Sequence, residues 1–116
     1  MVSLLEVSVV DDQKGRPTYA VDLARFIVHY IKMGDQPSFN LLHFSNSGSC
    51  TWYDFAQKIF AEEGSDLKVT AISSAKMNFK APRPSYSVLD LARLREGFAY
   101  NPRSWQEALK EMLSKL

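Results

Sequence analysis

The sequence predicts a small mixed α/β domain of short strands and about four helices. β-Branched and apolar residues cluster in short runs at residues 7–10 and 68–72, which is typical of strands. Between and after them, apolar residues recur every three or four positions, the period of an amphipathic helix. No repeat and no linker divides the 116 residues, so we expect one domain over residues 1–116.

Composition narrows the range of functions. A formal net charge of +1, with the basic residues spread among acidic ones, argues against nucleic-acid binding. Cys50 is the one cysteine, so no internal disulfide can form, and no Cys/His spacing predicts a metal site. No membrane segment or export signal is recognisable, and we expect a cytoplasmic protein.

Strands are predicted first at residues 7–10, where Asp11 and Asp12 end the apolar run. Gly15 and Pro17 then predict a turn. The run Leu-Leu-His-Phe at 41–44 predicts a second strand. The alternating segment 68–72 predicts a third.

The first predicted helix lies between Ala20 and Met33 and ends at Gly34. Its apolar stripe gives it one face that we expect to pack inward: Leu23, Ile27, Tyr30 and Ile31. Asp22, in the first turn, should complement the helix dipole and has no predicted catalytic role.

Three further helices are predicted from their boundary residues. Thr51 and Asp54 form an acidic variant of the capping box ahead of a helix at about 52–62, with Gly64 at its exit. Asp90 predicts the start of a short helix at about 90–96. Ser104 and Glu107 predict a capping box for the last helix, whose apolar stripe runs from Trp105 to Leu116. The loop before Thr51 ends at a helix N-terminus, where free backbone N–H groups can hold an anion. The apolar Trp52 and Phe55 that follow the loop favour core packing instead.

Arg83 is the first candidate for ligand binding. Pro82 and Pro84 flank it and push the backbone toward extended geometry, so that little entropy is lost when a ligand binds. A guanidinium held in this way can make paired hydrogen bonds to a diphosphate. The alternative is an arginine that pairs with a carboxylate and fastens the C-terminal segment.

The loop 11–18 supplies the other candidates. The turn should aim Gln13 and Thr18 in one direction, where both can hydrogen-bond a sugar or a base. Arg16 is a candidate phosphate ligand by its chemistry, although a solvated surface arginine is the more common situation for such a residue. Adjacent acids such as Asp11 and Asp12 are usually solvated.

Catalytic and cofactor motifs are missing from the chain. The five glycines are too far apart to form the glycine-rich loop that holds a dinucleotide. No tyrosine is followed four residues later by lysine, and His29 and His43 have no Ser or Cys partner at a recognisable spacing. We therefore assign no catalytic residue and expect no NADPH on this chain alone.

Three motifs occur in order: Asp-Gln-x-Gly-x-Pro-Thr at 12–18, Ser-Gly-x-Cys-Thr-Trp-Tyr-Asp-Phe-Ala at 47–56 and Arg-Pro-x-Tyr-Ser-x-Leu-Asp at 83–90. With them the chain resembles the C-terminal, substrate-binding part of dTDP-4-dehydrorhamnose reductase, an extended short-chain dehydrogenase/reductase. The resemblance implies that Arg83 contacts the diphosphate of a dTDP-sugar. It also implies that NADPH and the catalytic Tyr-x-x-x-Lys belong to an N-terminal nucleotide-binding domain upstream, so that Met1 is a cut edge and the chain alone is inactive.

Two alternatives remain open at this point. The regulatory subunit of methionine adenosyltransferase resembles the same reductase, so the chain is also compatible with a non-catalytic, partner-binding domain. Another sugar-nucleotide reductase or epimerase is the second alternative. In the first alternative an exposed apolar patch, where the nucleotide-binding domain would pack, could bind a partner or produce a homo-oligomer.

Overall fold

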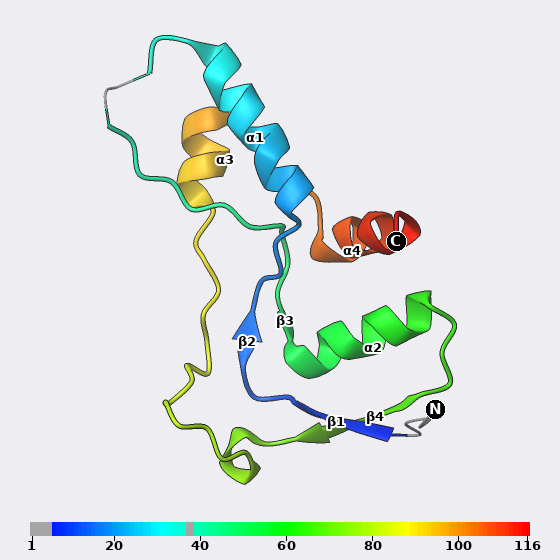
Figure 1. Cartoon of the computed structure of the whole chain (residues 1–116). Helices are drawn as coiled ribbons and strands as arrows, with labels where there is room; N and C mark the ends of the chain where they lie inside the picture. The colour runs from blue at the N-terminus through cyan, green and yellow to red at the C-terminus, as the bar shows by residue number, and fades with distance from the viewer. Residues whose placement is uncertain (1–5, 37–38) are drawn as a thin grey trace.

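In the computed structural model, which describes residues 6–36 and 39–116, two strand pairs and four α-helices lie along an elongated molecule (Figure 1). The extents are 55 × 33 × 22 Å and the radius of gyration is 17.3 Å. A compact chain of this length would have a radius of gyration of about 13 Å. The mixed α/β class is confirmed, but the elements do not surround a single core.

The bounds of the elements are these: β1 (Glu6–Val10), β2 (Lys14–Gly15), α1 (Ala20–Met33), β3 (Cys50–Thr51), α2 (Trp52–Glu62), β4 (Lys68–Ile72), a 3₁₀ turn (Ser74–Lys76), α3 (Ala92–Phe98) and α4 (Trp105–Ser114). Within these described residues, no helix is both long and apolar enough to cross a lipid bilayer.

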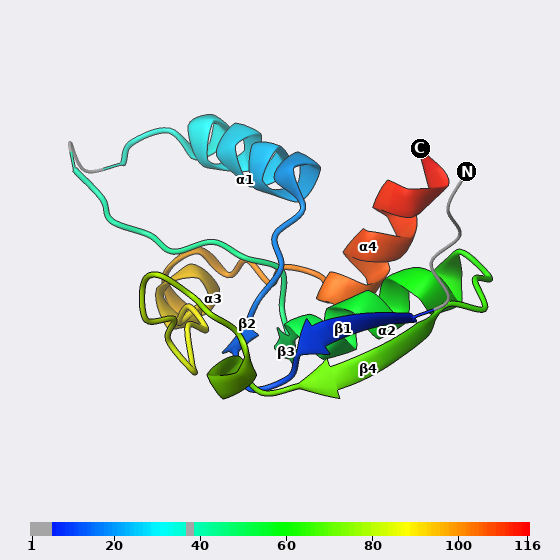
Figure 2. The same cartoon turned by 60° about the horizontal axis from the view of Figure 1, so that its bottom comes forward.

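The strands β1 and β4 form a parallel pair, in register from Glu6 opposite Lys68 to Val10 opposite Ile72. Both predicted strands are thus confirmed. The amide of Asp11 donates to the carbonyl of Ile72 at 3.0 Å and extends the pairing by one residue. Helix α2 packs against both strands, as Figure 2 shows.

Two predictions of local structure are wrong. Gly15 lies in β2 rather than in a turn, because Lys14 and Gly15 pair antiparallel with Thr51 and Cys50. Residues 41–44 form no strand, although their side chains alternate as in one: Leu42 and Phe44 are half-buried while Leu41 and His43 are exposed. The segment is extended but lies beside no second strand, and a strand requires a hydrogen-bonding partner.

The helix boundaries follow their capping residues closely. Thr51 and Asp54 form the reciprocal capping box at the start of α2. Gly64 adopts the left-handed conformation after that helix, with a φ of 65°. The hydroxyl of Ser104 accepts from the amide of Glu107, which confirms the start of α4. Helix α3 begins two residues later than predicted, with Leu91 rather than Asp90 at its N-cap; the Asp90 carboxylate instead accepts from the amide of Ala92, two residues on.

Helix α1 has the predicted bounds but not the predicted buried face. The residues of α1 that are buried are Asp22 and Phe26, and Tyr30 is half-buried. Leu23, Ile27 and Ile31, which the stripe placed inside, are exposed. The prediction was wrong because the elements around α1 cover only its Phe26 side.

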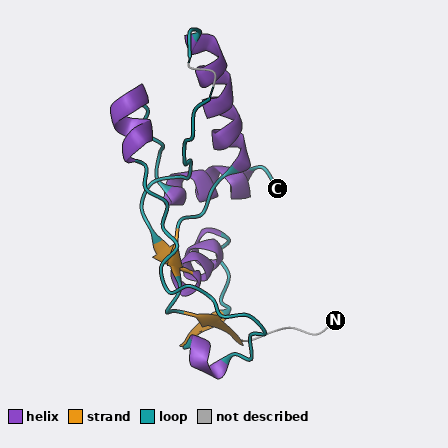
Figure 3. Ribbon diagram, turned by 90° about the vertical axis from the view of Figure 1, so that its left-hand side faces the viewer, coloured by secondary structure: helices purple, strands orange, loops and turns teal. Residues whose placement is uncertain are grey.

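Two separate apolar clusters stabilise the described part of the chain. The first joins α1, α3 and the segment before Ser45, with Phe26, Leu91 and Leu94 at its centre. The second joins α2 and α4, with Cys50, Trp105 and Leu109 at its centre. Figure 3 shows the two regions at different heights along the molecule.

Candidate functional site

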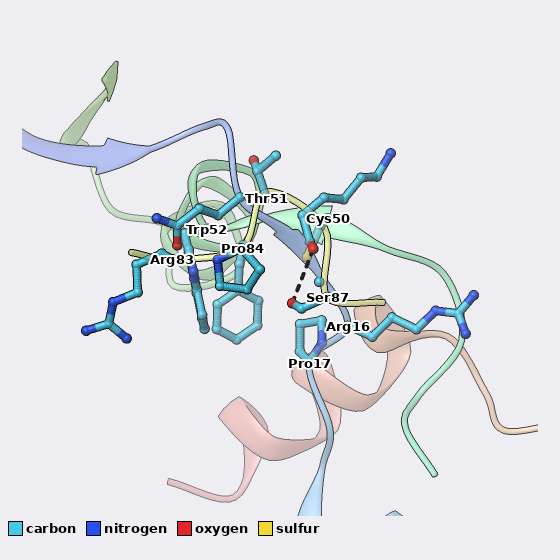
Figure 4. A pocket seen from close by; sticks show the side chains of 12 residues that line it. Arg16, Pro17, Cys50, Thr51, Trp52, Arg83, Pro84 and Ser87 are labelled. Atoms are coloured by element: carbon cyan, nitrogen blue, oxygen red, sulfur yellow. Dashed lines mark hydrogen bonds between the residues drawn. The ribbon is translucent and has the colours of Figure 1, made fainter. Parts of the chain in front are cut away.

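The three sequence motifs meet at one groove of about 210 Å³. Its walls come from β2, the start of α2 and the Arg83–Ser87 segment, so residues far apart in the sequence line it together (Figure 4). The lining residues are Gln13, Lys14, Gly15, Arg16, Pro17, Cys50, Thr51, Trp52, Phe55, Arg83, Pro84 and Ser87.

Backbone hydrogen bonds fasten the Arg83 segment along β2. The amide of Lys14 donates to the carbonyl of Ser85 at 2.9 Å, and the amide of Ser87 donates to the carbonyl of Lys14 at 2.8 Å. A Cβ on Gly15 would lie 3.1 Å from the hydroxyl oxygen of Ser87. Gly15 therefore favours this close approach of two chain segments, because a larger residue would press on the Ser87 hydroxyl, and it does not serve a turn.

Asp12 fastens the chain that leads from β4 to Arg83. Its carboxylate accepts from the backbone amide of Ser74, at 2.9 and 3.1 Å, and from the Ser74 hydroxyl. These hydrogen bonds hold the pKa of Asp12 below its ordinary value. The side-chain amide of Gln13 donates to the same hydroxyl at 2.9 Å. The loop 11–18 and the chain that leads to Arg83 are thus fixed to each other, and Asp12 is not simply solvated.

Arg83 lies at the mouth of the groove and is exposed. Its guanidinium carbon is 5.3 Å from the centre of the Phe79 ring, a cation–π contact. Among the described residues, the structure gives Arg83 no ion pair and no side-chain hydrogen bond. The guanidinium therefore has its donors available to an anion. The alternative, in which Arg83 pairs with a carboxylate to fasten the C-terminal segment, is not observed in the part of the chain that the structure describes.

Arg16 has a different environment from Arg83. Its Nε donates to the carbonyl of Gly48 at 2.6 Å, and its Nη1 donates to the carbonyl of Leu89 at 2.6 Å. In Figure 4 its side chain extends away from the Arg83 side of the groove. The expectation that Arg16 is a solvated surface arginine is therefore wrong, because its guanidinium fastens two loops to each other.

Gln13 and Thr18 do not point to the same place. Gln13 lines the groove with Arg83, whereas Thr18 lines a second cavity of about 100 Å³ beside Tyr19, Asn46 and Trp105. The predicted common direction was wrong, because the chain between them runs partly as a strand. On an extended chain, residues an odd number of positions apart face opposite sides.

Trp52 lines the groove, although its apolar character predicted core packing. It is 56% exposed and lines the groove beside Arg83, while Phe55 is half-buried behind it. The signal that could have identified it is its position at the first turn of α2, directly after a loop rich in Ser and Gly, where a large ring has little to pack against. An exposed indole next to a free guanidinium offers a ligand both a stacking surface and a cation.

Cys50 is buried at the base of the groove. Burial, reinforced by the nearby Asp54 carboxylate, raises the pKa of its thiol to about 11. The thiol is therefore neutral at physiological pH and is a packing group, not a nucleophile. No group of three His, Cys, Asp or Glu side chains that could hold a metal ion exists in residues 6–36 and 39–116.

A small mixed α/β module with an open groove lined by Arg83 and Trp52 defines a ligand-binding domain. The chain belongs to the RmlD substrate binding domain family, whose model matches residues 3–116. It is 41% identical to the spore coat polysaccharide biosynthesis protein SpsK of Bacillus subtilis, over 95% of this chain and 37% of that protein. It is 36% identical to a dTDP-4-dehydrorhamnose reductase of Aggregatibacter actinomycetemcomitans, over 91% of this chain and 39% of the reductase.

The fold is similar to that of a solved reductase. The crystal structure of dTDP-4-dehydrorhamnose reductase from Bacillus anthracis, in complex with NADP, matches with a TM-score of 0.83 and 35% identity, over 95% of this chain and 37% of that one. The chain thus spans less than two-fifths of the length of each of these relatives. The family and its relatives therefore confirm the resemblance that the three motifs predicted.

Proposed function

We propose that this chain is the sugar-nucleotide-binding part of an NADPH-dependent dTDP-4-dehydrorhamnose reductase of the cytoplasm, and that residues 1–116 act as one substrate-binding domain. The whole enzyme would reduce dTDP-4-dehydro-L-rhamnose to dTDP-L-rhamnose. Membership in the substrate-binding family and the similarity to reductases support this proposal.

The observation that carries the proposal is the juxtaposition of Arg83 and Trp52 in one groove. The planar guanidinium suits the paired oxygens of a diphosphate. The exposed indole suits the flat face of a thymine base or the apolar face of a sugar. Gln13 and Ser87 add polar groups at the edges of the groove, where they can bind hydroxyls.

The size of the groove explains why the chain would act only with a second part. At about 210 Å³ it is smaller than the 300–1,000 Å³ that pockets for ligands of this size usually have. We therefore propose that it holds one side of the dTDP-sugar. NADPH, which supplies the hydride when bound, and the residue that protonates the product would come from outside this chain, which has neither a glycine-rich loop nor Tyr-x-x-x-Lys.

An NMR titration of the chain with dTDP tests the proposal. We expect amide shifts confined to residues 11–18, 50–55 and 79–87. Arg83→Ala should raise the Kd for dTDP about tenfold, the effect of one lost charge-assisted contact, without changing the spectrum of the free chain elsewhere. Arg95→Ala removes the same charge from the exposed surface of α3 and is the matched control.

Two results would contradict the proposal. One is the absence of localised shifts at millimolar dTDP. The other is an equal loss of affinity in Arg83→Ala and Arg95→Ala, which would show that only net charge matters.

A further inference from the structure

The 3₁₀ turn Ser74–Lys76 begins two residues after β4 ends, and it is capped from another part of the chain. The first amides of a helical turn have no partner within the turn and need an acceptor from elsewhere. Ser73, at the N-cap, makes no side-chain cap hydrogen bond. The Asp12 carboxylate, 62 residues away, accepts instead from the Ser74 amide, at 2.9 and 3.1 Å, and from the Ser74 hydroxyl. Asp12 therefore fixes the direction in which the chain leaves β4.

This turn leads into the exposed loop that carries Arg83. All residues from 75 to 87 are exposed. Among the described residues, no backbone–backbone hydrogen bond is recorded for residues 78–84. The loop is held at its ends, by Asp12 at Ser74 and by the amide of Lys14, which donates to the carbonyl of Ser85 at 2.9 Å. Two residues of the 11–18 segment thus determine where this loop lies.

The contacts within the loop do not place Arg83 against the groove. Phe79, whose ring centre is 5.3 Å from the Arg83 guanidinium carbon, belongs to the same loop and moves with it. Pro82 and Pro84 restrict only the backbone next to them. No ion pair holds Arg83 in the part of the chain that the structure describes. The position of its guanidinium therefore depends on the two ends of the loop.

We propose that Asp12 is a positioning residue for the phosphate site, and that by capping the turn at Ser74 it holds Arg83 where the guanidinium meets a diphosphate. The inference rests on the proposed function, in which Arg83 contacts the diphosphate of a dTDP-sugar. Asp12 is not one of the residues that line the groove. A carboxylate near a diphosphate weakens binding by charge repulsion alone. A favourable contribution of Asp12 to affinity therefore has to come through the position of the loop.

Titration of the chain with dTDP, followed by NMR amide shifts, tests this role. Asp12→Ala should raise the Kd for dTDP about fivefold, because the ligand must then order the Arg83 side chain when it binds. If the charge of Asp12 were its only effect, removal of the carboxylate would lower the Kd. An unchanged or lower Kd in Asp12→Ala would overturn the proposal.

Asp11→Ala is the matched control. Asp11 carries the same charge at the neighbouring position, is exposed, and has no recorded side-chain hydrogen bond among the described residues. Its substitution should leave the Kd unchanged or slightly lower. An equal rise in the Kd in Asp11→Ala and Asp12→Ala would contradict a specific role of the Asp12 cap.

Two further variants distinguish positioning from a general structural role. Asp12→Asn keeps an acceptor oxygen for the Ser74 amide and should return the Kd to within about twofold of that of the unsubstituted chain. In the Arg83→Ala background, Asp12→Ala should change the Kd by less than about twofold, because the group that Asp12 positions is gone. A full fivefold rise in that background would overturn the proposal, since Asp12 would then act on another part of the groove.

Relaxation of the backbone amides gives a readout without ligand. Residues 78–84 should have lower order parameters in Asp12→Ala than in the unsubstituted chain, and unchanged ones in Asp11→Ala. Unchanged order parameters in both variants would contradict the proposal. If Asp12→Ala does not fold, Ser74→Ala applies the same test, because it removes the hydroxyl that binds both Asp12 and Gln13. It should raise the Kd about twofold to threefold, and an unchanged Kd would overturn the proposal.

The unsubstituted chain and Arg83→Ala separate this inference from the proposed function. The absence of localised shifts at millimolar dTDP would contradict both. Localised shifts that weaken about tenfold in Arg83→Ala, with a Kd unchanged in Asp12→Ala, would support the function and overturn only the role of Asp12.

Discussion

Arg103 and Asp22, 81 residues apart in the sequence, form a two-point ion pair. Arg103 Nε donates to Asp22 Oδ2 at 2.8 Å, and Arg103 Nη2 donates to Asp22 Oδ1 at 3.0 Å. Asn46 donates to the same carboxylate at 2.7 Å. The start of α1, the loop before β3 and the start of α4 are thus joined at one buried carboxylate, which lies between the two apolar clusters.

Asp22→Asn should destabilise the chain by about 2–4 kcal/mol, because it leaves Arg103 with a weaker partner in a largely buried place. Urea unfolding at pH 7 measures the change. Asp66→Asn, at an exposed position with no recorded side-chain partner, should have an effect close to zero. A similar loss of stability in both variants would show that removing any negative charge has this effect, whatever its partners.

Stability should fall as the solution is acidified. Burial opposes ionisation of Asp22, but the hydrogen bonds from Arg103 and Asn46 outweigh it and hold the pKa of Asp22 below its ordinary value. A carboxyl whose folded pKa is lowered stabilises the fold above its unfolded pKa, about 3.9, and loses this contribution as the pH falls through the folded pKa.

The pH dependence is measured by unfolding at pH 7, 5, 4 and 3. Most of the loss should occur below about pH 4. The slope should be shallower in Asp22→Asn. An identical slope in the two proteins would mean that other carboxyls, such as Glu111, whose pKa the Arg103 hydrogen bond also lowers, account for the acid sensitivity.

Gly48→Ala and Gly97→Ala should have effects of opposite sign. Gly48 has a φ of 83°, and a Cβ there would lie 3.1 Å from the Trp105 ring, so we expect a loss of about 1–2 kcal/mol. Gly97 lies in α3 with open space around it, so alanine should add about 0.5–1 kcal/mol. Thermal unfolding of both variants gives the sign of each change in stability. If Gly48→Ala leaves the stability unchanged, the backbone at residue 48 does not need glycine.

Arg16→Met tests whether Arg16 fastens loops or binds phosphate. Loss of its two hydrogen bonds to the Gly48 and Leu89 carbonyls should lower the free energy of unfolding by about 1–2 kcal/mol. Its effect on the Kd for dTDP should be smaller than that of Arg83→Met. Unchanged stability with a large loss of affinity would instead make Arg16 a phosphate ligand.

The candidate site was partly predictable. Prolines around Arg83 and the order of the three motifs indicated a ligand-binding loop, and the structure places Arg83 and Gln13 in one groove. The separate direction of Thr18, the hydrogen bonds of Arg16 and the exposure of Trp52 were not predictable. They depend on which segments come together: β2 beside β3, and the Arg83 segment beside Lys14.

The sequence by itself determined the elements whose stabilising interactions are local. The capping residues Thr51 and Ser104 and the exit glycine Gly64 act within one turn of the chain, so they fix helix ends wherever the helix packs. The tertiary structure alone decided which face of α1 is buried, that Asp22 meets Arg103, and that residues 41–44 remain unpaired. These features depend on contacts between residues far apart in the chain, and the periodicity of apolar residues does not specify the partner that covers them.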